Sequence, residues 1–181
     1  MEYKYGTAGF RYHSSIIKDI AYKIGESIAM LCSRNKCNYG IMVTASHNHY
    51  KDNGVKIINS FGEIISKEDE IFLESYVNSR IELCKYTKDY AISIGYDTRE
   101  SSPVISDLII DGIRNVNSAI AVINYNTIST PHLHDILFLK ENQYIDNLSK
   151  LFDTDQKVII DCANGIGSIT MKEVIKKKLN I

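Results

Sequence analysis

The chain is poor in several residue types that mark specialised proteins. It has no tryptophan and two prolines, and its four cysteines stand at positions 32, 37, 84 and 162. These spacings contain no C-x-x-C pair, so they do not match the common zinc-ribbon and dithiol motifs. Free thiols in a reducing compartment are the simplest interpretation, and we expect a cytoplasmic protein.

Long apolar runs and a strong charge of one sign are also missing. No apolar stretch reaches the ~18 residues that span a bilayer, and the first residues, MEYKYGTAGFRYH, contain no apolar signal core. The formal net charge is -1, and the one basic block is Lys176-Lys177-Lys178. Such a triplet on a terminal helix is typical of a solvated face that complements the helix dipole. We therefore expect neither a membrane nor a nucleic-acid partner.

The residues that are abundant predict a packed α/β protein. Hydrophobic residues make up 44% and charged residues 24% of the chain, as in ordinary folded domains. Strand-like and helix-like patterns alternate along the sequence, which is the arrangement of α/β folds. The length suits one complete domain and a piece of another. We expect domains at 1–153 and 154–181, with a boundary near 153–156.

The first half of the sequence predicts two helices and three strands. Ser14 and Ser15 are expected to cap a helix that begins near Ile16. Ser66 with Asp69 resembles a capping box at the start of a second helix. The expected strands are 39–45, 54–59 and a short one after a turn at Phe61-Gly62, and the second helix is expected at 67–77.

The second half continues the alternation. Strands are expected at 91–95 and 119–123, a helix with Pro103 in its first turn between them, and a further helix from Pro131. The helix after Pro103 is expected to bury Val104, Leu108, Ile109 and Ile113. A strand at 158–161, a tight turn at 164–167 and a helix at 168–179 would begin the second domain.

A serine follows the buried strand expected at 39–45. The local sequence is GIMVTASHNHYKDNGVKI, in which Ser46 precedes His47 and Asn48, and Lys56 comes ten residues later. A serine placed at a strand end with such neighbours is suited to a nucleophile or a phosphate carrier. Taken alone, the serine is more often a turn or helix cap. Lys56 alternates with apolar neighbours, which is also typical of a solvent-facing strand residue.

Five further segments accompany the serine loop in a definite order. They are YGTAGFR at 5–11, DNGVK at 52–56, GYDTRESS at 95–102, STPHLH at 129–134 and DCANGIG at 161–167. Together with the serine loop they resemble the phosphohexomutase superfamily, and in particular its phosphoacetylglucosamine mutase branch, in which the GYDTRESS-like segment follows the serine loop. The resemblance touches nearly the whole chain.

The resemblance implies a fold and a reaction. The fold is a mixed sheet packed between helices, followed by the first β-α unit of a second α/β domain. The reaction interconverts the 6-phosphate and 1-phosphate of N-acetylglucosamine through a phosphorylated Ser46 and a sugar bisphosphate intermediate, and it serves UDP-N-acetylglucosamine synthesis. The cofactors implied are Mg²⁺, bound in part through the phosphate on Ser46, and a sugar bisphosphate that phosphorylates this serine.

The resemblance also implies roles for individual residues. Lys56 assists proton movement at the sugar hydroxyl, for which burial or nearby positive charge must lower its pKa. Arg11 supplies positive charge and clamps a phosphate oxygen. Thr7, His47 and Asn48 bind phosphate or orient the loop. Asp97-Thr98-Arg99 is expected to fix a turn through hydrogen bonds, a structural role.

The chain departs from the family pattern in two ways. The family binds Mg²⁺ through a D-x-D-x-D-R loop, which this chain lacks; Asp153-Thr154-Asp155 reads as a solvated linker. We therefore expect missing downstream domains to complete the active site, and little mutase activity from this chain alone. His49 stands where the family usually has proline, which leaves the loop freer unless other contacts hold it.

Two other classes of function stay open at this point. One is a non-catalytic phosphosugar-binding or regulatory module of the same fold, and the other is an unrelated α/β nucleotide-binding protein. The pairs His47/His49 and His132/His134 admit a zinc site, but no third ligand stands at a recognisable spacing. The turn at 164–167 lacks the glycine fingerprint of a dinucleotide-binding loop.

Overall fold

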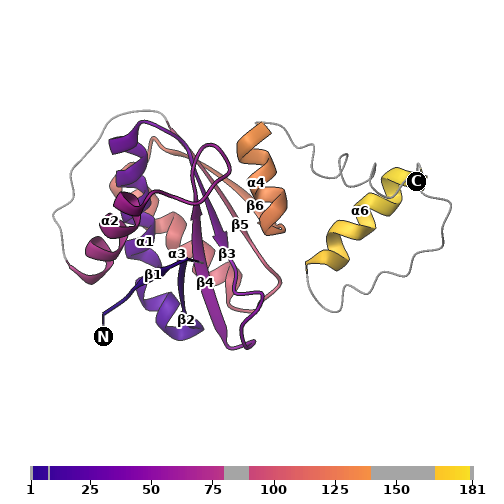
Figure 1. The fold of residues 1–181 in the computed structure, drawn as a ribbon, viewed down its shortest axis with the longest axis horizontal. Coiled ribbons are helices and arrows are strands. Elements are labelled where there is room, and N and C mark those ends of the chain that lie inside the picture. Colours follow the sequence, from indigo (N-terminus) through magenta and orange to yellow (C-terminus); the bar gives the residue numbers. More distant parts are fainter. Residues whose placement is uncertain (1, 8, 80–89, 140–165, 180–181) are drawn as a thin grey trace.

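Six strands form one mixed sheet in the order β1-β2-β4-β3-β5-β6. The computed structural model describes residues 2–7, 9–79, 90–139 and 166–179 (Figure 1). The strands are β1 Tyr5–Gly6, β2 Gly9–His13, β3 Tyr39–Val43, β4 Asp52–Ile58, β5 Ala91–Tyr96 and β6 Ala121–Thr127. β3, β5 and β6 run parallel to one another, whereas β1, β2 and β4 pair antiparallel. The α/β class and the mixed sheet between helices are confirmed.

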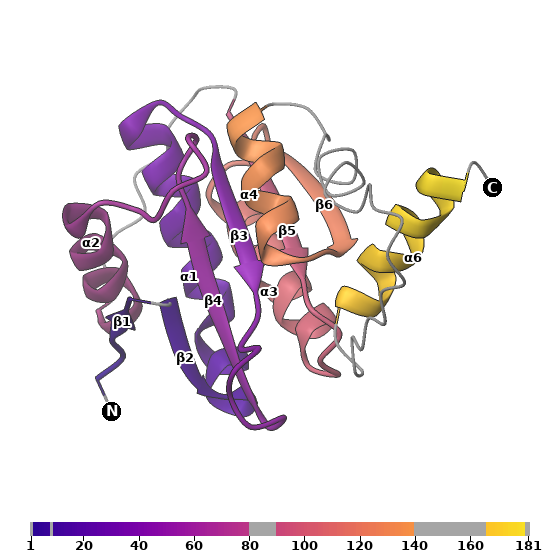
Figure 2. The same cartoon turned by 45° about the vertical axis from the view of Figure 1, so that its right-hand side comes forward.

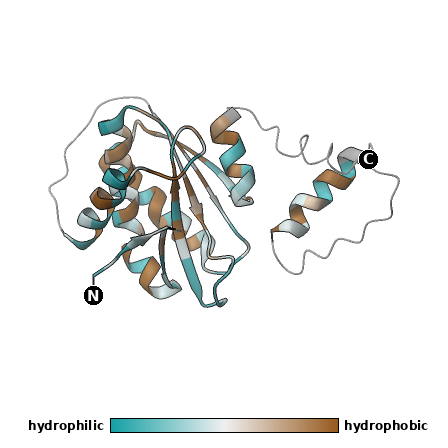
Figure 3. Cartoon of the chain, in the orientation of Figure 1, coloured by the Kyte–Doolittle hydropathy of each residue, from teal (hydrophilic) through white to brown (hydrophobic). Residues whose placement is uncertain are grey.

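Helices cover both faces of this sheet. The helices of the described residues are α1 Ser14–Asn35, α2 Lys67–Asn78, α3 Ser102–Val116, α4 Thr130–Leu139 and α6 Gly167–Leu179. α1 and α3 lie together on one face and α4 lies on the other, against β3 and β5 (Figure 2). In Figure 3 the helices carry brown as well as teal residues, as expected for amphipathic helices packed on a sheet.

The alternation of side chains along β3 and β4 divides the core in two. Ile41 and Val43 point to the large cluster built with α1 and α3. Met42 points the other way and joins the smaller cluster beneath α4, together with Ile58 of β4. Because successive strand residues face opposite sides, Lys56 shares the α4 face with these two residues.

α1 and α3 approach each other closely through two glycines. A Cβ atom built on Gly25 would lie 2.0 Å from the carbonyl oxygen of Ile109, and one built on Gly112 would lie 2.0 Å from that of Tyr22. Neither position has room for a side chain. The two helix backbones therefore touch, which fixes their separation and the position of both over the sheet.

Most of the expected elements are present, with shifted ends. The first helix begins at Ser14, and its cap is His13, whose ring accepts a hydrogen bond from the Ser15 N–H at 3.4 Å. The prediction of serine caps was therefore wrong. Ser66 does cap α2, accepting from the Asp69 N–H at 3.2 Å. The short third strand is reduced to one bridge between Ile58 and Ile64.

The buried face of α3 differs from the prediction. Ile109 and Ile113 are buried, but Val104 is 48% exposed and Leu108 is only partly buried. The apolar stripe instead starts at Ile105. The strand expected at 119–123 runs from Ala121 to Thr127.

Several expectations lie outside the described residues. These are the strand at 158–161, the domain boundary near 153–156, the acidic linker and the cysteines at 84 and 162. Cys32 and Cys37 are described, and both are free thiols. Across the described parts of the chain, no helix is long and apolar enough to cross a membrane.

Candidate active site

A cavity of about 1160 Å³ opens where β3 and β5 end, and it is lined by residues far apart in the sequence. β3 leads into the loop that carries Ser46, β5 leads into the Asp97 turn, and β6 leads toward Thr130 and Pro131. All six residues proposed from the sequence line it: Thr7, Arg11, Ser46, His47, Asn48 and Lys56. The structure thus brings the expected site residues to one cavity.

The serine loop is a tight turn between β3 and β4. Ala45 is buried and Ser46 is exposed at the cavity. The Asn48 N–H donates to the Ala45 carbonyl at 2.8 Å, and the Asp52 N–H donates to the His49 carbonyl at 2.9 Å. These bonds turn the chain so that the Ser46 side chain stands free of the buried strand that delivers it.

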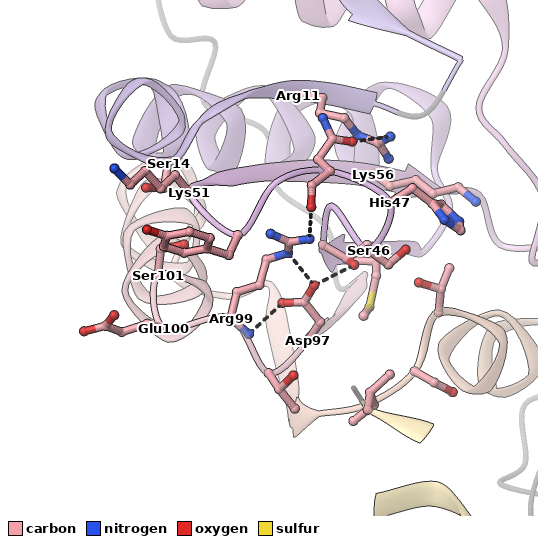
Figure 4. Close-up of a pocket in the computed structure, with 18 of the residues that line it drawn as sticks. Arg11, Ser14, Ser46, His47, Lys51, Lys56, Asp97, Arg99, Glu100 and Ser101 are labelled. Carbon is pink, nitrogen blue, oxygen red and sulfur yellow. Dashed lines mark hydrogen bonds and ion pairs between the residues drawn. The ribbon is translucent and has the colours of Figure 1, made fainter. Parts of the chain in front are cut away.

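The guanidinium of Arg99 holds this loop through hydrogen bonds to its backbone. It donates to four backbone carbonyls, those of Ala45, Asn48, His49 and Asp52, the last three at 3.1, 2.9 and 3.0 Å. Its side chain is only 13% exposed. Figure 4 shows the guanidinium between Asp97 and the loop that carries Ser46. A planar group with five N–H donors suits such a set of convergent carbonyls.

Asp97 in turn fixes Arg99. Its carboxylate accepts from Arg99 Nε at 3.2 Å and from the Arg99 backbone N–H at 3.0 Å. It also accepts from the hydroxyls of Thr44 at 2.8 Å and Ser102 at 2.7 Å. The structural role expected for Asp97 and Arg99 is therefore visible here, and it extends beyond their own turn to the serine loop.

Arg11 lies on β2 across the cavity from this pair. Its Nη1 donates to Asn48 Oδ1 at 3.1 Å, which ties the loop to β2. Its Nε is buried and has no hydrogen-bond partner among the described residues. Arg11 also lines the cavity, and its positive charge favours an anionic ligand there.

Lys56 faces α4 and the cavity, so the interpretation as a solvent-facing strand residue is wrong. The side chain is half-buried, and this burial lowers the pKa of Lys56. Its Nζ lies 3.3 Å from Nε2 of His134 on α4. Sequence reasoning missed His134, because only the packing of α4 on the sheet shows which face of the helix meets β4.

Positive charge is concentrated in the cavity although the whole chain is nearly neutral. Among the described residues, the cationic side chains in the lining are Arg11, Lys18, Lys51, Lys56 and Arg99, and the acidic ones are Asp97 and Glu100. Asp97 is already paired with Arg99. The excess favours an anionic ligand such as a phosphate ester. Lys18 and Lys51 were not singled out from the sequence, since neither belongs to a distinctive motif.

The described residues do not by themselves form a magnesium site. Magnesium requires several oxygen ligands in octahedral geometry. No cluster of three His, Cys, Asp or Glu side chains suited to a metal occurs in the described parts of the chain. Asp97 is occupied by its four hydrogen bonds.

Comparison with known proteins gives consistent matches. Residues 26–83 match the family described as phosphoglucomutase/phosphomannomutase, alpha/beta/alpha domain I. Phosphoacetylglucosamine mutase 1 of Schizosaccharomyces pombe is 33% identical over 99% of this chain and 42% of its own length. The human phosphoacetylglucosamine mutase is 29% identical over 94% of this chain and 38% of its own length.

Solved structures agree with these matches. A crystal structure of N-acetylglucosamine-phosphate mutase in the substrate complex superposes with a TM-score of 0.87 at 25% identity, covering 99% of this chain and 40% of that one. The Aspergillus fumigatus enzyme in complex with GlcNAc-6P and magnesium gives 0.81 at 27% identity, covering 97% and 38%. A serine-to-alanine variant of that enzyme, in complex with glucose 1,6-bisphosphate, gives 0.82 at 25% identity with the same coverage.

The fold and the serine loop at its cavity, with these matches, define a class: the chain has the fold of the α-D-phosphohexomutase superfamily and is similar to its members in sequence. Within that class its relatives are the phosphoacetylglucosamine mutases, as the sequence motifs indicated. The chain spans about 40% of the length of these relatives.

Proposed function

We propose that this chain is the phosphoserine-bearing part of an N-acetylglucosamine-phosphate mutase, which interconverts the 6-phosphate and 1-phosphate of N-acetylglucosamine. The observation that carries the proposal is the exposed Ser46, which lies on a loop held by Arg99 and lines a cavity with excess positive charge. The ligands of the related crystal structures, GlcNAc-6P, glucose 1,6-bisphosphate and magnesium, support it.

In the proposed reaction Ser46 carries the transferred phosphoryl group. The bond between phosphorus and the Ser46 oxygen breaks, a bond to the free sugar hydroxyl forms, that hydroxyl passes its proton to Lys56, and the freed Ser46 oxygen takes up a proton. The sugar bisphosphate then reorients, and its other phosphate returns to Ser46. Catalysis of such a transfer rests on positioning and on positive charge around the moving phosphoryl group.

Lys56 and Arg11 supply these two requirements. A lysine accepts a proton only in its neutral form, and burial lowers the pKa of Lys56 toward the working range. Arg11 lines the cavity and supplies positive charge to a phosphoryl oxygen. Thr7, His47 and Asn48 line the cavity around the serine and complete the phosphate-binding surface.

Magnesium, when bound, would neutralise charge on the transferring phosphate. This chain would contribute the phosphate on Ser46 as a ligand, and the described residues hold no cluster of side chains that would supply the remaining ligands. For this reason we expect little complete mutase turnover from these 181 residues alone. Phosphorylation of Ser46 is the part of the reaction that belongs to this chain.

The test is to incubate the purified chain with glucose 1,6-bisphosphate and magnesium and to measure phosphorylation by intact mass and peptide mapping. We expect one phosphoryl group on Ser46, and none in Ser46→Ala. Ser118→Ala, which removes an exposed serine elsewhere, should be phosphorylated like the wild type. Phosphate on other serines to the same extent would contradict the proposal.

A second candidate is a phosphosugar-binding module without catalysis. The cation-lined cavity, together with the lack of a metal-ligand cluster among the described residues, favours it as the alternative. Saturable binding of GlcNAc-6P in calorimetry, with no phosphate on Ser46 after incubation with the bisphosphate, would establish this function instead.

A further inference from the structure

The ring of His134 links a backbone carbonyl to the amine of Lys56. Its Nδ1 is hydrogen-bonded to the carbonyl oxygen of Gly62, and its Nε2 lies 3.3 Å from Lys56 Nζ. The three groups come from the loop after β4, from α4 and from β4 itself. They form one chain of hydrogen bonds that ends at the cavity.

The direction of each bond follows from the chemistry of the groups. A carbonyl oxygen only accepts, so Nδ1 of the neutral ring carries the proton that it donates to Gly62. Nε2 then has a free lone pair, and the Lys56 nitrogen donates to it. The tautomer of His134 is thus set by the Gly62 carbonyl, and its acceptor faces Lys56.

The Gly62 carbonyl is itself held in place. The side-chain oxygen of Asn59 accepts from the N–H groups of Phe61 at 2.9 Å and Glu63 at 3.0 Å, on either side of Gly62. Gly62 has φ +75°, and a Cβ there would lie 2.8 Å from the His134 carbonyl. The loop is therefore packed directly on α4, and the ring is anchored at both nitrogens.

We propose that His134 is the positioning residue for Lys56. By accepting one N–H of the amine, His134 fixes the Lys56 side chain so that the nitrogen lone pair of the neutral amine is directed away from α4, toward the sugar hydroxyl in the cavity. The inference rests on the proposed role of Lys56 in moving a proton. Without the ring, the long lysine side chain would sample other rotamers, and proton transfer would slow.

Positioning requires a neutral imidazole. A protonated ring has no lone pair for Lys56 and would bring a second positive charge to 3.3 Å from it. Burial and the charge of Lys56 both lower the pKa of His134, while the bond to Gly62 raises it. On the strands beside Lys56 the neighbours are Gly9 and Met42, which carry no charge. On the elements that meet at the pair, the other charged or titratable groups are Arg11 and His47 in the cavity lining, Glu63 on the loop, and His132 and Asp135 on α4.

The contact itself is tested by NMR of the histidine rings in the full 181-residue chain. Long-range ¹H–¹⁵N spectra should show His134 with its proton on Nδ1 at neutral pH. Lys56→Met keeps the length of the side chain but removes the charge, so the pKa of His134 should rise; the exposed Lys67→Met should leave it unchanged. A proton on Nε2, or a His134 titration that ignores Lys56→Met, would overturn the inference.

The role is tested by the rate of Ser46 phosphorylation from glucose 1,6-bisphosphate. His134→Leu should slow it by about tenfold, less than the ~10²–10⁴-fold that a general acid or base contributes directly. His134→Gln, whose side-chain oxygen can accept from Lys56, should recover part of the rate. Unchanged rates in both variants, with Lys56→Met inactive, would also overturn the inference. A wild-type chain that is not phosphorylated would refute the proposed function itself, and the NMR titration would still decide whether His134 holds Lys56.

Discussion

Arg99 donates a hydrogen bond of 2.9 Å to the backbone carbonyl of His49, fifty residues earlier in the chain. His49 occupies the position where the family resemblance leads us to expect proline. A proline would restrict this turn through its own ring, whereas here a buried guanidinium restrains it through space. The geometry of the serine loop thus depends on a tertiary contact.

Replacing Arg99 should therefore loosen the loop. Arg99→Lys keeps the charge but cannot reach four carbonyls at once, so we expect a loss of about 1.5–3 kcal/mol in the free energy of unfolding, the usual range for hydrogen bonds to a charged group. Faster amide exchange at 45–52 should accompany it. Urea denaturation and hydrogen-exchange mass spectrometry measure the two effects. Arg114→Lys, on the exposed side of α3, is the control, and an equal loss there would count against the clamp.

A proline at position 49 should compensate for the missing guanidinium. It restricts its own φ and the conformation of Asn48, so His49→Pro should recover part of the exchange protection of the loop in the Arg99→Lys background. In the wild-type background Arg99 already holds the loop, so His49→Pro should change the exchange protection only slightly. The comparison of all four proteins is a double-mutant cycle. Equal effects in the two backgrounds would show that residue 49 and Arg99 act independently.

The close approach of α1 and α3 should not tolerate a methyl group. Gly25→Ala places a Cβ 2.0 Å from the Ile109 carbonyl oxygen, and we expect the helices to shift at a cost of about 1–3 kcal/mol, despite the better helix propensity of alanine. Gly6→Ala is the matched control, because nothing lies within 4 Å of a Cβ there. Urea denaturation midpoints of both variants test this, and a neutral Gly25→Ala would contradict the described packing.

Lys56 should lower the stability of the fold while serving the reaction. Burial lowers the pKa of Lys56 in the folded chain from its ordinary value of 10.5. Below the lowered pKa the lysine is charged in both the folded and the unfolded chain, and the cost of burying the charge is fully present. Between the lowered pKa and 10.5 the unfolded chain binds more protons, so stability rises with pH in that window.

Lys56→Met should remove this cost and this pH dependence together. We expect a higher urea midpoint than wild type at pH 7, a flatter pH profile above it, and no phosphorylation of Ser46. Lys67→Met, at a side chain that is 76% exposed and bound to Glu70, should not raise the midpoint. A Lys56→Met chain that is less stable than wild type at pH 7 would contradict the prediction, because it would show that burying the amine of Lys56 does not lower the stability of the fold.

Local patterns predicted the parts of the fold that depend on neighbouring residues. Ser66 caps α2 because its hydroxyl reaches an N–H three residues on. The apolar run at 39–45 forms a buried strand because both faces of the sheet are covered. Val104 was assigned to the core wrongly, since one residue is enough to rotate a side chain by 100° around a helix and only the docking of α3 sets the rotation.

In the candidate site, too, the sequence predicted only residues that are close together in the chain. Ser46 and Lys56 stand out because they are close together in one motif, and both line the cavity. His134 reaches Lys56 across 78 residues, and Arg99 reaches Ala45 across 54. Nothing in the local sequence of either partner indicates the other. Contacts of this kind come from the strand order, which places β3 between β4 and β5.

The distance in sequence between the serine loop and Arg99 has a consequence for the newly made protein. When the chain has left the ribosome only as far as β4, Ser46 is already outside. Arg99, which binds the serine loop, and β5, which precedes Arg99, have not yet emerged. Because domains fold as units during synthesis, the loop acquires its shape only after β5 has joined the sheet. A nascent chain therefore carries the serine that we propose to be phosphorylated before the loop around it has the shape described here.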